Sequence, residues 1–368
     1  MRVQEKMQRL LDDLVRNGRE RGLQLAAYLD GKLVVDAWAG VADVNTGRRV
    51  DGATLFPVFS TTKGLAATLI HLLVERCKLT YDTPIAAVWP EFAAQGKQSI
   101  TVRHALSHTT GLACMPLGVG YAELVDWDAM CRAIARMRPV SSRGAQSVYH
   151  AVTYSWLVGE VAHRVDGRPF GQMLQEEICR PLGIGDDMFV GIPDEVEPRV
   201  AWLEEIFESG QPPVVDNTVP RDVPGWMLPL HAWMNQPQVR RACVPASNGI
   251  MTARALARHY ASLLPGGVDG VALLPPARVR EATQVQLQTD SLAENTPRHI
   301  ALGYMILGAG KGPDTPATAF GHGGYGGSVG FADPQHRLAV GLTKNRYCKN
   351  GAQDEILSEL RGVLGIPR

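Results

Sequence analysis

The stretch Leu55–Arg76, "LFPVFSTTKGLAATLIHLLVER", places a serine and a lysine where a loop turns into an apolar helix. Its leucines recur at helical spacing and its alanines widen the apolar stripe, which predicts a deeply buried helix. Ser60 and Lys63 are three positions apart, so they would share one face of that helix. Lys63 is the only charged residue between Asp51 and Glu75. A lysine in a buried helix is costly unless the protein uses it.

The Ser60–Lys63 pair has two interpretations. In the first, Ser60 caps the helix and Lys63 is a solvated surface charge, since the Ser-x-x-Lys spacing often arises by chance. In the second, Ser60 is a nucleophile, and a hydroxyl needs an adjacent base to act as one. Lys63 could be that base if burial lowered its pKa, and the helix N-terminus would favour a developing oxyanion. The lack of other charges in the stretch favours the second interpretation.

A tyrosine is the next candidate for this chemistry. Tyr149 lies in "SVYHAVTYSWLVGE", just before a predicted helix, where its phenol could meet Ser60 and Lys63. A nearby ammonium lowers the pKa of a phenol, and a phenolate can serve as a base. The alternative is a core tyrosine with a satisfied hydroxyl. We expect Tyr154, inside the helix, to have that second role.

The glycine-rich stretch "FGHGGYGGSVGFADP" matches three patterns at once. Gly321-x-Gly323-x-x-Gly326 fits a dinucleotide-binding fingerprint, and Gly326-x-Ser328-x-Gly330 fits the nucleophile elbow of α/β-hydrolases. Both patterns require a helix directly afterwards, whereas turn and strand residues follow here, so we reject the fingerprint and disfavour Ser328 as the nucleophile. The third interpretation is a strand at a sheet edge, His322–Gly324, whose small residues let a substrate lie close.

The stretch "HALSH" holds His104 and His108 at the i, i+4 spacing of a zinc-binding helix. The glutamate of the zinc motif is missing, because Ala105 stands in its place, and no third ligand is evident. We therefore expect two polar residues satisfied near a helix end, with no metal and no cofactor.

Composition excludes several classes of function. Lysine plus arginine and aspartate plus glutamate both number 37, and no basic run favours nucleic acid or a membrane surface. No apolar run approaches the roughly 20 residues of a membrane span, and the charged N-terminal stretch lacks the apolar centre of a secretory signal. The six scattered cysteines predict free thiols. We expect a cytoplasmic enzyme with a small-molecule substrate; the oligomeric state is not indicated.

The pattern of elements predicts two domains. An amphipathic helix over 3–20 and a hairpin at Asp30-Gly31 open the chain. Helical patterns and long loops fill the middle, including a helix ended by Gly167 and another closed by Pro181 and Gly183. The end of the chain reads as four strands, "HIALGYMILGAG", "ATAFGHGG", "GSVGFADPQ" and "RLAVGLTKN", followed by a last helix.

These elements predict an α+β fold, in which helices flank an antiparallel sheet and a mostly helical domain is inserted. The α/β domain would comprise residues 1–76 and 242–368, and the inserted domain residues 77–241. The active site would lie between the two. Within 77–241, the loop rich in Pro, Trp and Met predicts a pocket wall, with Trp226 and Trp233 as lining residues.

Taken in order, these motifs resemble the serine β-lactamase and penicillin-binding-protein superfamily, and most closely its branch of class C β-lactamases and family VIII carboxylesterases. The resemblance runs from about residue 23 to 365. It rests on "STTK" together with "RHALSHTTGL", "YHAVTYSWLVGE", "PASNGIMTARALARHYA" and "FGHGGYGGSVGFADP". It implies the same two-domain fold and an active site in the groove between the domains.

The resemblance also implies residue roles. Ser60 matches the acylated nucleophile, and Lys63 and Tyr149 match the general-base pair. His322, Gly323 and Gly324 match the substrate-binding Lys-Thr-Gly triplet. Tyr325 follows that triplet, so its backbone N–H is expected to form the oxyanion hole with the N–H of Ser60.

Two departures point away from β-lactams. The asparagine of the family's Tyr-x-Asn motif is Ala151 here, and the lysine of Lys-Thr-Gly is His322, which is mostly neutral near pH 7. Both weaken recognition of a carboxylate-bearing amide. The expectation is a serine carboxylesterase that uses a covalent acyl-serine and takes short to medium acyl chains. An acyltransferase, a weak β-lactamase or D-aminopeptidase, and a catalytically silent scaffold of the same fold remain alternatives.

Overall fold

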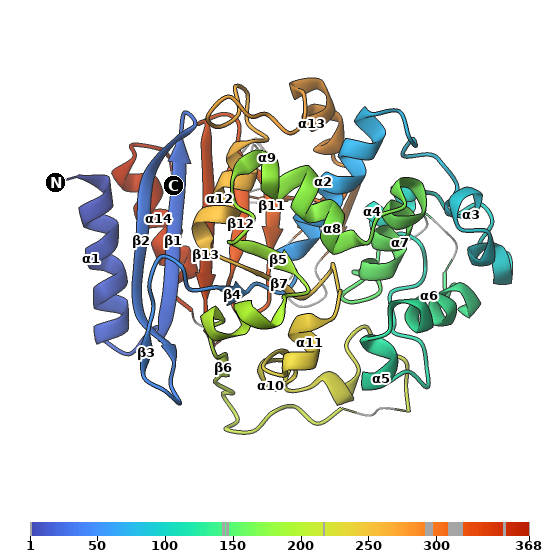
Figure 1. The fold of residues 1–368 in the computed structure, drawn as a ribbon, viewed down its shortest axis with the longest axis horizontal. Coiled ribbons are helices and arrows are strands. Elements are labelled where there is room, and N and C mark those ends of the chain that lie inside the picture. Colours follow the sequence, from blue (N-terminus) through green and yellow to red (C-terminus); the bar gives the residue numbers. More distant parts are fainter. Residues whose placement is uncertain are drawn as a thin grey trace.

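A large antiparallel sheet forms one side of the molecule (Figure 1). The computed structural model describes residues 2–141, 144, 147–215, 218–290, 297–307, 319–348 and 351–367. The sheet has nine strands: β1 (Gly22–Leu29), β2 (Lys32–Asp43), β3 (Arg48–Arg49), β8 (Leu287–Asp290), β9 (Pro297–Ile300), β10 (Met305–Leu307), β11 (Ala319–Gly323), β12 (Val329–Asp333) and β13 (Leu338–Lys344). Their order is β3-β2-β1-β13-β12-β11-β10-β9-β8.

The sheet joins the two ends of the chain. β1 pairs antiparallel with β13, with Leu25 opposite Leu342, and β1 and β2 form the predicted hairpin. Its turn residues Asp30 and Gly31 have φ values of 52° and 74°, the left-handed conformation that such turns need. The predicted antiparallel arrangement is therefore confirmed. One detail is wrong: "HIALGYMILGAG" forms two paired strands, β9 and β10, because the chain turns at Gly303.

Helices cover both faces of the sheet (Figure 1). On one face lie α1 (Val3–Arg16) and α14 (Gln353–Val363), and on the other lies α12 (Ala253–Ala261). Side chains alternate along β1, so Leu23 and Leu25 pack with the first pair of helices, whereas Ala26 and Tyr28 pack on the opposite side. The predicted N-terminal helix ends earlier than expected, at Arg16.

The rest of the chain is mainly helical. Its α-helices are α2 (Thr62–Glu75), α3 (Ile85–Val88), α4 (Val102–Leu106), α5 (Tyr121–Leu124), α6 (Trp127–Arg136), α7 (Tyr154–Asp166), α8 (Phe170–Leu174), α9 (Arg180–Leu182), α10 (Leu230–Met234), α11 (Pro237–Arg241) and α13 (Pro276–Ala282). Shorter 3-10 turns are η1 (Pro90–Gly96), η3 (Asp194–Arg199) and η4 (Gly225–Met227).

Two helices can be compared with the C-terminal ends that the sequence predicted. α7 stops at Gly167, which is left-handed, as predicted. The next predicted helix is interrupted: α8 passes into the π-helical turn η2 (Gln175–Cys179) and then into α9. Pro181 does not close it, because proline is tolerated at the start of the new helical turn, and the helix ends at Gly183 instead.

Two small sheets tie the middle segment to the rest. β5 (Met188–Val190) and β4 (Phe56–Pro57) pair on either side of β7 (Gly249–Met251), and β6 (Glu204–Glu205) pairs in parallel with β14 (Arg346–Tyr347). The sequence did not predict these short strands. The domain boundaries at residues 76/77 and 241/242 stay a prediction, since one continuous apolar core includes side chains from both parts.

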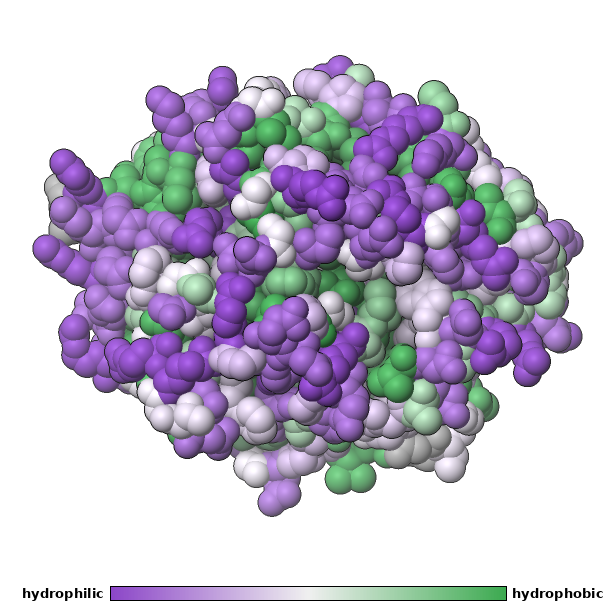
Figure 2. Space-filling view, viewed as in Figure 1, coloured by the Kyte–Doolittle hydropathy of each residue, from purple (hydrophilic) through white to green (hydrophobic). Residues whose placement is uncertain are grey.

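The surface, the cysteines and the helix lengths can be compared with what the composition predicted. The face in Figure 2 is mostly hydrophilic and is hollowed near its middle, where hydrophobic residues form the floor. All six cysteines are free thiols, as predicted. Across the described ranges, the helices are too short or too polar to cross a membrane.

Candidate active site

The backbone before α2 presents Ser60 in a constrained turn. The chain enters along β4, and Phe59 then takes a φ of 47°, which is uncommon for a residue other than glycine. Phe59 forms a bridge with Asn248, and Lys63 N donates to the carbonyl of Ser60 at 3.0 Å as the helix begins. Ser60 is thus held at the first turn of a helix. Residues 62–74 of that helix are buried, as predicted.

Lys63 is fully buried, as predicted, and its amine has three close partners. Nζ lies 3.1 Å from Ser60 Oγ, 2.8 Å from the carbonyl oxygen of Ala151 and 3.0 Å from that of Ala246. None of these partners carries a charge. A neutral amine keeps two N–H donors and one lone pair, so it can donate to both carbonyls and accept the Ser60 hydroxyl proton.

The surroundings of Lys63 favour that neutral form. Burial holds the pKa of Lys63 well below its usual value of 10.5. In the described part of the chain, no carboxylate forms an ion pair with Lys63 that would offset this effect. The pair Ser60–Lys63 therefore has the geometry and the electrostatics of a hydroxyl beside a base.

Tyr149 lies beside this pair. Lys63 Nζ is over the face of the Tyr149 ring, 4.8 Å from its centre, and the ring centre of His322 is 6.1 Å from that of Tyr149. The predicted grouping of Ser60, Lys63 and Tyr149 is thus found in one place, while the role of Tyr149 as part of a base pair stays a prediction. Tyr154 is a core residue, as expected, but its hydroxyl has no hydrogen-bond partner among the described residues, so the expectation of a satisfied hydroxyl is wrong.

The His322-Gly323-Gly324 segment forms the end of β11 and the start of the turn after it. His322 is buried, and its Nδ1 lies 2.6 Å from the carbonyl oxygen of Gly323. A Cβ at Gly324 would come within 2.0 Å of the carbonyl oxygen of Val58, so only glycine fits there. The end of β11 is therefore packed against the residues that lead into Ser60.

A second contact holds this turn beside α2. The Thr61 hydroxyl donates to the carbonyl of Ser328 at 3.2 Å, and Gly324 N donates to the same carbonyl at 2.7 Å. Within the described ranges, the backbone N–H groups of Ser60 and Tyr325 donate to no backbone carbonyl. Two N–H donors on adjacent turns are what an oxyanion hole requires.

The two predicted pocket tryptophans differ in exposure. Trp226 is half-buried and lines a cavity of about 380 Å³ together with Met115, Glu123 and Arg221. Trp233 is buried, and its ring centre is 6.5 Å from that of Phe59. Their roles in substrate binding stay predictions.

The rejected motifs have structural roles. Ser328 is only 1% exposed and precedes the strand β12 directly, so there is no nucleophile elbow, and the dinucleotide fingerprint lacks its helix in the same way. His104 belongs to the capping box of Thr101 at the start of α4. His108 Nδ1 accepts from the backbone N–H of His150 at 3.1 Å. Both histidines are therefore polar residues held near a helix, as expected.

Sequence reasoning missed three features of the site. The His108 ring centre is 4.8 Å from that of Tyr149, so it supports the tyrosine. The carbonyl of Ala246 binds Lys63, and Glu205 accepts a hydrogen bond from the Tyr325 hydroxyl. The local sequence around Glu205, "WLEEIFE", carries no signal for this contact.

Together these groups can perform acyl transfer to a serine. The Ser60 hydroxyl lies beside the buried amine of Lys63, and Tyr149 is adjacent to both. The backbone N–H groups of Ser60 and Tyr325 are donors that could bind a negative oxygen. Among the described residues, no cluster of histidine, cysteine or carboxylate side chains could hold a metal ion.

Comparisons with known proteins show which family and fold the whole chain resembles. The family described as "Beta-lactamase" matches residues 7–358. The esterase/β-lactamase LipL of Mycobacterium tuberculosis is 34% identical over 360 residues, which cover 94% of this chain and 81% of LipL. A solved family VIII carboxylesterase is similar with a TM-score of 0.86 and 31% identity, covering 97% of this chain and 96% of that one. A penicillin-binding protein homologue from Caulobacter crescentus gives a TM-score of 0.84 and 34% identity, covering 99% and 97%.

Proposed function

The chain belongs to the β-lactamase family of serine hydrolases, and we propose that it is a carboxylesterase that works through a covalent acyl-serine. Ser60 is the proposed nucleophile, Lys63 and Tyr149 the proposed base pair, and the N–H groups of Ser60 and Tyr325 the proposed oxyanion hole. The relatives named esterase and carboxylesterase support the choice of substrate class.

The proposed reaction has two halves. Ser60 Oγ attacks the ester carbonyl carbon while its proton moves to the Lys63–Tyr149 pair, and the two N–H groups stabilise the tetrahedral oxyanion. The C–O bond to the alcohol then breaks, and the alcohol leaves with the proton returned by the pair. Water repeats the sequence on the acyl-serine, which releases the carboxylic acid and restores Ser60.

The single observation that carries the proposal is the Ser60–Lys63 contact. Nζ lies 3.1 Å from Oγ, and burial lowers the lysine pKa, so the amine can accept the hydroxyl proton. A helix cap with a surface lysine would leave Nζ in water, whereas Lys63 is fully buried. A silent scaffold gives no reason for a buried amine to lie beside both the Ser60 hydroxyl and the Tyr149 ring.

The substrate end of the site favours an ester over a β-lactam. His322 is buried and has no permanent charge to attract a substrate carboxylate. Ala151 contributes a backbone carbonyl to Lys63 and has no side-chain amide to offer a substrate. We infer that the natural substrate is an uncharged ester with a short to medium acyl chain.

The test is ester hydrolysis by the wild type and by Ser60→Ala. We expect p-nitrophenyl acetate, butyrate and octanoate to be cleaved by the wild type, with the octanoate slowest. Ser60→Ala should lose at least about a hundredfold in turnover. A phosphonate inhibitor should label the peptide that contains Ser60.

Ser328→Ala is the matched control, since Ser328 lies outside the proposed machinery and should leave turnover unchanged. Equal rates for the wild type and Ser60→Ala would contradict the mechanism. Faster cleavage of a chromogenic cephalosporin than of any ester would instead assign a β-lactamase.

A further inference from the structure

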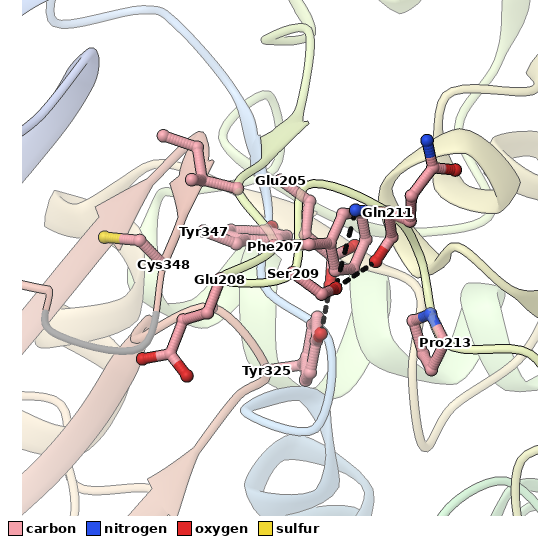
Figure 3. Close-up of a pocket in the computed structure, with 11 residues that line it drawn as sticks. Glu205, Phe207, Glu208, Ser209, Gln211, Pro213, Tyr325, Tyr347 and Cys348 are labelled. Carbon is pink, nitrogen blue, oxygen red and sulfur yellow. Dashed lines mark hydrogen bonds between the residues drawn. The ribbon is translucent and has the colours of Figure 1, made fainter.

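The Tyr325 side chain is anchored by a buried carboxylate. Its hydroxyl donates to Glu205 Oε1, and the second oxygen of Glu205 lies 3.1 Å from His231 Nδ1. The Glu205 side chain is only 5% exposed, although it lies at the wall of a cavity of about 480 Å³ (Figure 3). Burial and the neighbouring carboxylate raise the pKa of Tyr325, so its phenol stays protonated and donates.

The Tyr325 ring is also packed against the residue that precedes the nucleophile. The ring centres of Phe59, Tyr325 and Tyr347 lie 5.6–5.8 Å apart in three edge-to-face pairs. Such pairs are a favoured aromatic geometry. This cluster, the Phe59–Tyr325–Tyr347 triangle, connects the turn that holds Ser60 with the turn that holds Tyr325.

Glu205 belongs to the same assembly through the backbone. It lies on β6, directly opposite Tyr347 on β14, and the N–H of Ile206 donates to the carbonyl of Tyr347 at 2.7 Å. One short sheet therefore positions both the carboxylate that binds the Tyr325 hydroxyl and one ring of the triangle. Figure 3 shows Glu205, Tyr347 and Tyr325 converging on one cavity.

The Tyr325 backbone needs such anchors because its neighbours are glycines. Gly323 and Gly324 precede it, and Gly326 and Gly327 follow it with φ values of 86° and 98°. Glycine restricts the backbone less than any other residue. Two backbone hydrogen bonds, from Gly324 N to the Ser328 carbonyl and from Gly327 N to the Gly324 carbonyl, do not involve Tyr325 itself. The contact of Gly324 with Val58 holds the turn near Ser60, and the Tyr325 side chain adds a second anchor at Tyr325 itself.

We propose that Glu205 is a positioning residue for the oxyanion hole, because it holds the Tyr325 hydroxyl and so fixes the Tyr325 backbone N–H beside Ser60. This inference rests on the proposed function. Glu205 touches no reacting atom; it acts through Tyr325. The hydrogen bond, rather than the charge, carries the effect, because the phenol needs an acceptor at that position.

A double-mutant cycle on ester hydrolysis tests this role. Glu205→Leu and Tyr325→Phe should each lower kcat about tenfold, since a displaced oxyanion donor is costly, with KM changed less than about twofold. The double variant should be no slower than either single variant, because both remove the same hydrogen bond. Glu205→Gln keeps an acceptor and should restore kcat to within about twofold of the wild type.

The control is Glu204→Leu, which makes the same change on the same strand. Glu204 points the other way and pairs with Arg21 at 2.8 Å, so its loss should leave kcat unchanged. Three results would each overturn the inference. The first is a double variant in which the two losses of kcat multiply, and the second is an unchanged kcat for Glu205→Leu. The third is a Glu205→Gln variant as slow as Glu205→Leu. Tyr325→Phe keeps the ring and tests the same bond if Glu205→Leu fails to fold.

Failure of the inference and failure of the proposed function give different results. A wild type without ester turnover, or with turnover that survives Ser60→Ala, overturns the carboxylesterase and this inference together. A wild type that depends on Ser60 but is insensitive to Glu205→Leu and Tyr325→Phe overturns only the role of Glu205.

Discussion

Gly324 and Val58 are in direct backbone contact, and this contact joins the two halves of the candidate site. A Cβ at position 324 would lie 2.0 Å from the carbonyl oxygen of Val58 and 2.8 Å from the Thr61 hydroxyl. Carbon and oxygen atoms do not approach so closely, so any side chain here must push the end of β11 away from Ser60. The contact fixes the distance between the nucleophile and the turn that contains Tyr325.

Gly324→Ala should therefore damage both activity and stability. We expect ester turnover to fall at least about tenfold, because the displaced turn misplaces the Tyr325 N–H. The free energy of unfolding should fall by about 1–3 kcal/mol, as for other overpacked sites. Steady-state kinetics and urea denaturation measure the two effects.

Gly323→Ala is the matched stability control. Its Cβ would meet only the Ser328 carbonyl oxygen, at 3.9 Å, so its free energy of unfolding should change little. An equal loss of stability in both variants would show that the Val58 contact is not responsible.

Lys63→Arg should abolish the base, because it replaces an amine that can be neutral with a permanent cation. Arginine stays protonated in proteins, so it cannot accept the Ser60 proton. We expect acylation by p-nitrophenyl butyrate to slow at least about a hundredfold, as measured by the burst of p-nitrophenol. In the wild type, the acylation rate should rise with pH as Lys63 loses its proton. A Lys63→Arg variant with wild-type acylation would rule out Lys63 as the base.

Burial of Lys63 also predicts how stability depends on pH. Because its folded pKa lies well below 10.5, the unfolded chain binds a proton between these two pKa values that the folded chain does not. The unfolding free energy of the wild type should therefore rise with pH in that window, relative to Lys63→Met, by up to about 1.4 kcal/mol per pH unit. The loss of folding stability that comes from burying Lys63 is largest at pH values below its folded pKa, and it vanishes above pH 10.5.

Chemical denaturation of both proteins at several pH values between 7 and 10 measures this difference. Lys32→Met, at an exposed position, should give a curve parallel to that of the wild type. If the difference in unfolding free energy between the wild type and Lys63→Met stays constant across this pH range, Lys63 has the same pKa in the folded and the unfolded chain.

His322→Lys should shift the substrate preference towards anionic substrates. A lysine at the end of β11 would add a cation beside Tyr149 that can pair with a substrate carboxylate. We expect the ratio of kcat/KM for a chromogenic cephalosporin to that for p-nitrophenyl butyrate to rise about tenfold, which corresponds to about 1.4 kcal/mol. His322→Asn adds no charge and should leave the ratio near that of the wild type. A similar rise in both variants would mean that size, not charge, sets the preference.

Much of the site was predictable because its signals are local. The buried helix with Lys63 follows from the spacing of leucines around one charged residue, and the antiparallel hairpins follow from apolar runs separated by turn residues. The rejection of the Ser328 elbow also needed only the strand pattern after it. These features depend on neighbours within a few positions, which the sequence displays directly.

The sequence by itself thus determined the family, the antiparallel sheet and the grouping of Ser60, Lys63 and Tyr149. Only the tertiary structure decided what surrounds them. The carbonyls of Ala151 and Ala246 come from distant parts of the chain, and Glu205 meets Tyr325 across 120 positions. Such contacts leave no periodic signal, because they depend on how separate elements pack and on which backbone groups that packing brings together. The lowered pKa of Lys63 has the same origin, since burial is a property of the assembled core.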